Sequence, residues 1–165
     1  MDLASSIIGA IILAICIAPF IIMSTNRKKR ERKALKTLQK IAQQHDCEIT
    51  NYEIGDDFVI GIDEPKRIVF FNKKLKETVF EQHIKLADVQ ACKIKNISRT
   101  VSNQNGNYNV VEELDLCFVP IEKGKKEVLL EFYNAENSTQ LSGELQAIEK
   151  WQSIINACMG NKKNR

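Results

Sequence analysis

The stretch that decides the fold is "LSGELQAIEKWQSIINAC", residues Leu141 to Cys158. Its large apolar residues recur at steps of four, three, three, four and three, which places them along one side of an α-helix. A helix with a single apolar stripe must bury that stripe against other structure. The segment therefore predicts a terminal helix that lies on a core built by earlier residues. The stripe consists of Leu141, Leu145, Ile148, Trp151, Ile155 and Cys158.

The residues before this helix show the shorter period of β-strands. In "FVIGID", for example, Phe58, Ile60 and Ile62 fall on one face, and turn signals rich in Gly, Pro, Asp and Lys separate the runs. The alternation shifts near Ala91 and Cys92, which indicates a β-bulge, and residues 102–107 read as a loop. About seven strands are predicted, over residues 47–54, 58–63, 67–72, 77–86, 89–100, 108–121 and 128–132.

Seven strands followed by a helix resemble the pleckstrin-homology-like fold, with the likeness covering Asp46 to Met159. Trp151 takes the helix position at which many members of that superfamily carry a tryptophan. The resemblance implies an α+β domain: a seven-stranded antiparallel, partly open barrel capped by the C-terminal helix. Leu145, Ile148, Trp151 and Ile155 would form this structural cap. The whole chain also resembles small bacterial membrane-anchored proteins with a cytosolic domain of this type.

The best-known activity of that fold, phosphoinositide binding, is not expected here. Members with that activity hold phosphates with lysines and arginines on the first two strands and the loop between them. The corresponding stretch, residues 46–65, contains no lysine or arginine. It carries seven acids, which repel phosphate: Asp46, Glu48, Glu53, Asp56, Asp57, Asp63 and Glu64.

The amino-terminal segment from Leu3 to Met23 contains no charged side chain. About 20 mainly apolar residues suffice to cross a hydrocarbon core of about 30 Å, so the segment predicts a transmembrane helix. A secretory signal peptide is the alternative, but it would carry positive charge in front, where this chain has only Asp2. Within the segment, small residues recur every four positions and predict a helix-dimer stripe for a homodimer: Ser6, Ala10, Ala14 and Ala18.

Basic residues follow the apolar segment at one end only. Lysine and arginine near a span stay on the cytoplasmic side, which predicts a single-pass membrane protein with its N-terminus outside and its C-terminal domain cytoplasmic, in the inner membrane if bacterial. At this position the run would contact lipid headgroups, and no nucleic-acid partner is expected. The predicted membrane-surface contacts are Arg27, Lys28, Lys29, Arg30, Arg32 and Lys33.

These segments together predict four parts of the chain. Residues 1–24 form the anchor, 25–45 a basic stalk helix, 46–160 the pleckstrin-homology-like domain, and 161–165 a basic tail. The formal net charge is +3, of which residues 27–33 supply +5 and Asp2 supplies −1, so residues 34–165 are close to neutral at −1. Five scattered cysteines include no C-x-x-C pair, so neither a disulfide framework nor a zinc site is predicted.

Catalytic motifs are missing from the sequence, which has only two histidines, His45 and His83. We therefore expect no enzyme, no cofactor and no metal. The favoured function is a membrane-tethered cytosolic adaptor that binds a protein or peptide partner at a sheet edge or beside the terminal helix. The alternative is a peripheral sensor of anionic lipid that uses the juxtamembrane basics and turn lysines, with Lys73, Lys74 and Lys76 as candidate anion contacts.

Overall fold

A computed structural model describes residues 28–75, 78–103, 106–138 and 140–160. The chain divides into two compact units, Met1–Thr37 and Leu38–Arg165, and a helix over residues 28–44 crosses the division. The described part of the first unit is helical, with the Thr37 hydroxyl donating a hydrogen bond to the Lys33 carbonyl at 3.0 Å. All strands among the described residues belong to the second unit.

Within the described ranges, no helix combines the length and the apolar character needed to cross a membrane. This finding contradicts the predicted transmembrane helix and the single-pass localisation with a cytoplasmic domain that was built on it. The segment from Leu3 to Met23 that prompted the prediction lies outside the described residues, as do Arg27 and the stripe of Ser6, Ala10, Ala14 and Ala18.

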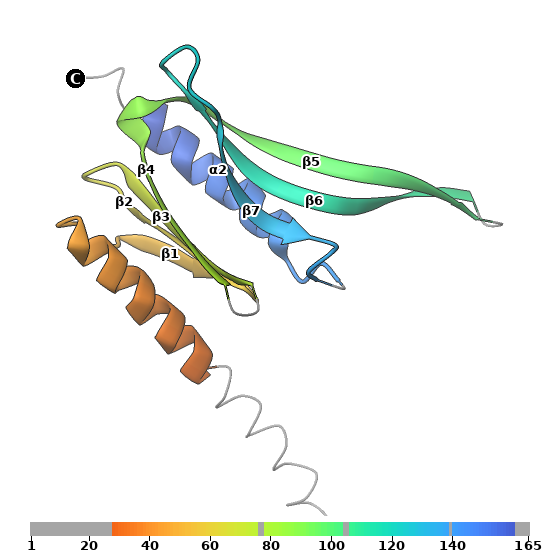
Figure 1. Cartoon of the computed structure of the whole chain (residues 1–165), viewed down its shortest axis with the longest axis horizontal. Helices are drawn as coiled ribbons and strands as arrows, with labels where there is room; N and C mark the ends of the chain where they lie inside the picture. The colour runs from red at the N-terminus through yellow and green to blue at the C-terminus, as the bar shows by residue number, and fades with distance from the viewer. Residues whose placement is uncertain (1–27, 76–77, 104–105, 139, 161–165) are drawn as a thin grey trace, which may run out of the picture. The chain divides into compact units, whose positions relative to one another are not determined.

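The described strands of the second unit form two antiparallel sheets (Figure 1). The four-stranded sheet has the order β1-β2-β3-β4, and the three-stranded sheet has the order β5-β6-β7. A 3₁₀ turn, η1 (Leu86–Asp88), joins them, and helix α2 (Glu144–Gly160) follows the last strand. The strands are β1 (Asn51–Ile54), β2 (Phe58–Asp63), β3 (Ile68–Leu75), β4 (Thr78–Lys85), β5 (Val89–Asn103), β6 (Gly106–Pro120) and β7 (Val128–Asn134).

The predicted single barrel is therefore wrong. In the described chain β4 pairs with β3 and β5 pairs with β6, and no ladder joins β4 to β5 across η1. Strands β4 and β5 are separated by η1, and the sheets to which they belong pack against each other across a shared core instead of joining edge to edge.

The core lies between the two sheets and beneath α2. Phe58 and Phe71 from the four-stranded sheet contact Phe132 from β7, with ring centroids 4.6 and 5.7 Å from it. Ile148, Trp151 and Ile155 of α2 are fully buried in the same cluster. The apolar stripe of α2 thus supplies one wall of this core.

The other face of the four-stranded sheet packs against the end of the first helix, where Leu38, Ile41 and Ala42 are buried. The contact depends on Gly61 in β2, because a Cβ atom there would lie 2.7 Å from a Leu38 methyl carbon. A larger residue at this position would push the helix away from the strand.

Candidate functional site

Strand β4 is an edge of the four-stranded sheet, since its described partner is β3 alone. Its sequence, "TVFEQHIK", contains no proline. One row of its backbone N–H and C=O groups consequently faces away from the sheet, and such a row can pair with another extended chain.

Two apolar side chains of β4 are exposed beside this free edge. Val79 is 49% exposed and Phe80 is 48% exposed. Consecutive strand residues point to opposite faces, so one apolar side chain stands on each side of the edge. Phe80 lies opposite Lys73 of β3, on the face that carries Phe71 and Val69 further along the strand.

At the other edge of the four-stranded sheet, β1 is hydrogen-bonded to helix α2. Glu53 of β1 accepts hydrogen bonds from Trp151 Nε1 at 2.8 Å and from Lys150 Nζ at 2.9 Å. On β5, the Cys92 carbonyl accepts from the side-chain amides of Gln152 and Asn156, both at 3.4 Å. The helix therefore ties β1 to β5, and the exposed apolar edge is β4.

Lys73 is buried and links the two sheets. Its ammonium lies 3.3 Å from a carboxylate oxygen of Asp57 and 3.0 Å from one of Glu131, and it donates to the Glu131 carbonyl at 3.2 Å. Burial raises the pKa of Asp57, although Lys73 opposes that shift. The Asn134 and Lys73 hydrogen bonds lower the pKa of Glu131 against the effect of burial. The ammonium is thus occupied by carboxylates within the domain.

A shallow groove of about 500 Å³ adjoins this ion-pair cluster. Its charged lining is acidic, and the buried Glu144 carboxylate at the start of α2 accepts a hydrogen bond from the Ser142 backbone N–H that precedes the helix. The groove thus has the wrong charge for an anion. It is lined by Asp56, Ala135, Glu136, Asn137, Ser138, Gln140, Ser142 and Glu144.

The thiols of the described residues are poor nucleophiles. Burial raises the pKa of Cys92 to about 12 and that of Cys117 to about 11, and burial also raises the pKa of Cys47. Thiolates are scarce at such values, and the thiolate is the reactive form. The Cys47 thiol instead donates to the His45 carbonyl at 3.3 Å.

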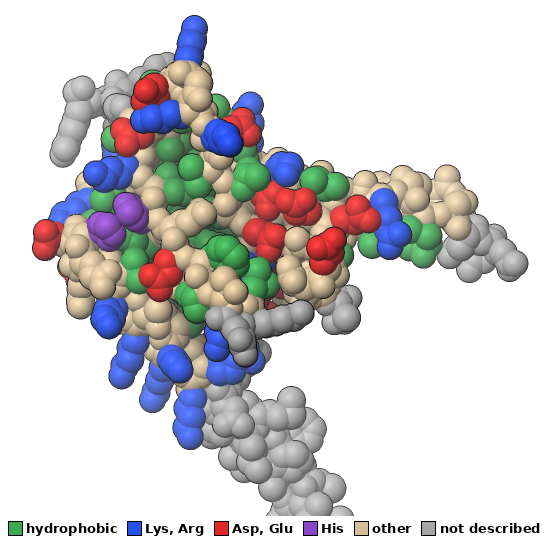
Figure 2. Space-filling model, viewed as in Figure 1, with side chains coloured by type: hydrophobic (Ala, Val, Ile, Leu, Met, Phe, Trp, Pro, Cys, Tyr) green, Lys and Arg blue, Asp and Glu red, His purple; other side chains and the backbone are tan. Residues whose placement is uncertain are grey.

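The two histidines form a surface pair. The His45 and His83 ring centroids are 4.1 Å apart, and Figure 2 shows the two side chains side by side. Burial, His45 and Lys85 lower the pKa of His83, so this ring is largely neutral at pH 7. The described residues contain no group of three or more His, Cys, Asp or Glu side chains that could hold a metal ion.

On the outer face of the three-stranded sheet, Asp115 is buried beside Lys95 and Glu113. Lys95 Nζ lies 3.3 Å from Asp115 and 3.6 Å from Glu113. Burial, followed by the neighbouring Glu113 carboxylate, raises the pKa of Asp115 to about 6. The Lys95 ammonium opposes this shift without cancelling it.

We expect an NMR titration of the Asp115 carboxyl carbon to show a midpoint near pH 6. An acid whose pKa is higher in the folded than in the unfolded state holds its proton more tightly when folded. Its contribution to stability is therefore present below about pH 4 and is lost as pH rises through about 6. Removing the cation by Lys95→Met should raise the midpoint further. A midpoint near 4, or no response to Lys95→Met, would contradict this assignment.

The residues singled out in the sequence fall into separate places. Among the predicted basic contacts, residues 28–33 lie on the helix of the first unit, whereas Lys73 is buried and Lys74 is exposed in the second. Lys76 lies outside the described residues. Leu145 is half-buried, and the other members of the predicted cap, Ile148, Trp151 and Ile155, are fully buried.

Val79 and Phe80 were not among the predicted site residues, since residues 77–86 were predicted only as one of seven strands. Two adjacent apolar residues among polar neighbours were the available signal. The burial of Lys73 had a clearer signal, since this lysine is in phase with Val69 and Phe71 at the strand period of two.

No protein-family model, curated protein or solved structure matches the chain.

Proposed function

We propose that the second unit is a protein-binding module that takes up an extended, uncharged segment of a partner protein as an added strand along β4. The observation that carries the proposal is the free edge of β4 with Val79 and Phe80 exposed on its two sides. In such recognition, main-chain hydrogen bonds supply affinity and alternate side chains supply specificity.

The chemistry of the edge indicates what the partner segment contains. Val79 and Phe80 are consecutive in β4, so an added strand would meet one exposed apolar side chain on each face of the sheet. A segment with apolar residues in two neighbouring positions would cover both side chains and exclude water from the new ladder. Absence of catalytic activity stays a prediction that accompanies this function.

The alternative lipid function has less support. Of the turn lysines nominated for anion contact, Lys73 is enclosed by Asp57 and Glu131. The described groove carries Asp56, Glu136 and Glu144, which would repel phosphate headgroups.

A peptide-binding experiment on the full chain tests the proposal. The probes are fluorescent peptides of about nine residues in which two adjacent apolar residues, valine and phenylalanine, are flanked by serine and threonine, a length within the usual range of strands. Fluorescence anisotropy should show saturable binding, and Phe80→Lys should weaken it by roughly tenfold or more, because a lysine blunts an edge strand. Tyr52→Lys is the matched control, since Tyr52 is an aromatic residue of the other edge strand, β1, and is 46% exposed.

Hydrogen exchange locates the bound peptide. Amides of β4 that exchange quickly in the free chain should become protected in the complex, while amides of β1 should not change. Equal losses for Phe80→Lys and Tyr52→Lys would refute an edge site on β4. Binding to phosphatidylserine vesicles that vanishes at high salt, with no peptide binding, would instead support the lipid alternative.

A further inference from the structure

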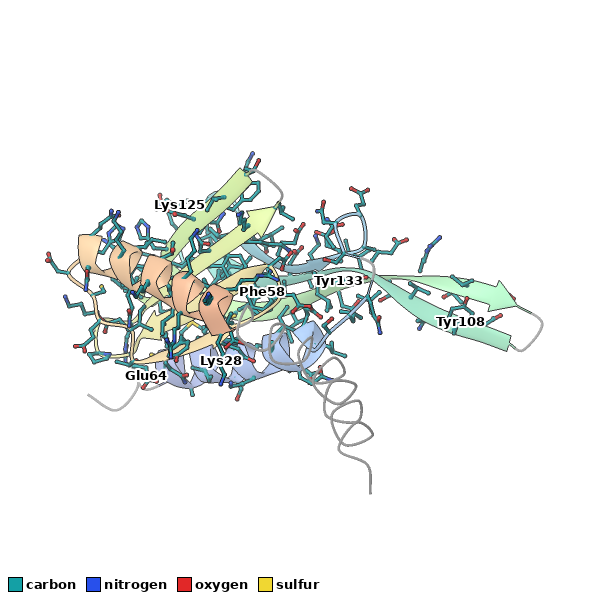
Figure 3. All side chains as sticks on the ribbon, turned by 90° about the horizontal axis from the view of Figure 1, so that it is seen from below. Lys28, Phe58, Glu64, Tyr108, Lys125 and Tyr133 are labelled. Atoms are coloured by element: carbon teal, nitrogen blue, oxygen red, sulfur yellow. The ribbon has the colours of Figure 1, made fainter. Side chains whose placement is uncertain are left out.

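The hairpin of β5 and β6 extends beyond the sheet to which it belongs. Strand β7 pairs with β6 over Glu113–Phe118, and the Ala135 N–H just after β7 donates to the Glu112 carbonyl at 2.8 Å. Residues 98–103 and 106–111 of the hairpin, which we call the arm, continue outward, and among the described residues they pair only with each other. Figures 1 and 3 both show the arm projecting, and in Figure 3 Tyr108 lies on it, well away from Phe58 and Tyr133.

The two faces of the arm differ in character. Val101 lies opposite Tyr108, and Arg99 lies opposite Val110, on one face. Polar pairs occupy the other face towards the tip, including Thr100, whose hydroxyl donates to the Asn109 side-chain oxygen at 3.0 Å. The first face is therefore an apolar stripe, and Tyr108 within it is 49% exposed.

The outer edge of β6 in the arm has no protection against pairing. Residues 106–111, "GNYNVV", contain neither a charged residue nor a proline, which are the usual means of blunting an edge. In Figure 2 the described surface of the arm is mostly green, for hydrophobic side chains, and tan, for uncharged polar side chains and backbone. The nearby charges are already matched, because Arg99 Nε lies 3.0 Å from a Glu112 carboxylate oxygen. A two-stranded ribbon of this kind is only marginally stable without a further strand.

We propose that a second copy of this chain supplies that strand, with β6 of one arm pairing antiparallel to β6 of the other about a two-fold axis. The same edge then serves both copies, as a two-fold interface requires. The apolar stripe continues across both arms only if each of its residues lies directly opposite a residue of the same face in the other copy. The register that places Asn109 opposite its own copy meets this condition.

This register makes the edge complementary to itself. Tyr108 of each copy then stands opposite Val110 of the other, giving two aromatic–β-branched pairs on the apolar face. Glu112 falls opposite Gly106, which has no side chain to oppose the carboxylate. In this register the apolar residues of the stripe in one copy lie opposite apolar residues of the other, and the one charge of this edge, Glu112, keeps its ion pair with Arg99.

Sedimentation equilibrium of the full chain tests the proposal. The chain should form dimers reversibly with rising concentration, and Val110→Lys should raise the dissociation constant roughly tenfold or more by placing a cation beside Tyr108 of the other copy. Ser102→Lys is the matched control, because it adds the same charge to the other strand and to the polar face. It should leave the dissociation constant unchanged.

A cysteine cross-link tests the register. Asn109→Cys places two thiols opposite one another at the two-fold axis, within reach of a disulfide, so diamide should cross-link this variant. Thr100→Cys, on the other strand, should give no more cross-linked dimer than the unsubstituted chain. A chain that stays monomeric, or an association that Val110→Lys leaves intact, would refute the proposal. Loss of peptide capture through Val110→Lys in a monomeric chain would assign the arm to a foreign strand instead.

Discussion

Trp151→Ala should lower the free energy of unfolding by about 3–5 kcal/mol, the range measured for removal of a large buried aromatic side chain. Trp151 of α2 is fully buried in the core, and its indole N–H donates to a carboxylate oxygen of Glu53 at 2.8 Å. The substitution removes apolar contact together with one of the two hydrogen bonds from α2 to Glu53 of β1. Urea unfolding followed by circular dichroism measures the loss.

Two variants separate the contributions at this position. Trp151→Phe keeps most of the apolar contact and removes the indole donor, and because Lys150 still donates to Glu53, it should cost only about 1–2 kcal/mol. Ser153→Ala, at an exposed position of the same helix, should change stability by less than about 0.5 kcal/mol. If Trp151→Ala were as mild as Ser153→Ala, α2 would not be part of the core.

Lys73→Met should destabilise the chain by about 2–3 kcal/mol. Breaking a fully buried ion pair by removing one partner costs about 3–5 kcal/mol, because the remaining charge stays unpaired. The side chains of Asp57 and Glu131 are 24% and 29% exposed, so water compensates for part of the loss. The measurement is again urea unfolding, at pH 7.

Removing the two carboxylates as well distinguishes this mechanism from a simple packing defect. The triple variant Lys73→Met, Asp57→Asn and Glu131→Gln has no unpaired charge and should recover most of the lost stability. Lys74→Met, at the adjacent exposed position, is the control and should be nearly neutral. A triple variant less stable than Lys73→Met alone would contradict the ion-pair explanation.

The local elements follow from residue patterns in the sequence. The alternation of "FVIGID" coincides with β2, and the stripe of Ile148, Trp151 and Ile155 is the buried side of α2. Both elements depend on interactions between residues that are close in sequence, and the hydrophobic periodicity reflects these interactions. The prediction was wrong at the hairpin tip. Residues 102–107 were predicted as a loop, whereas the ladder of β5 and β6 extends to the pair of Asn103 and Gly106.

The candidate sites required the arrangement of distant strands. Val79 and Phe80 in β4 are as apolar as residues of the core, and nothing local shows that their strand is an edge. The strand period places Lys73 in phase with Val69 and Phe71, but only the position of β7 brings its partner Glu131 to within 3.0 Å of it. Burial and exposure depend on which strands become neighbours, and a single sequence does not record those pairings directly.

By itself, the sequence determined where strands alternate and where the terminal helix presents its apolar side. These features depend on the periods of two and 3.6 residues, which are properties of the local backbone. Only the tertiary structure decided that η1 separates two sheets, that β4 remains an open edge and that the arm extends past β7. Those outcomes depend on hydrogen bonds and packing between residues far apart in the chain, which the local pattern of residues does not specify.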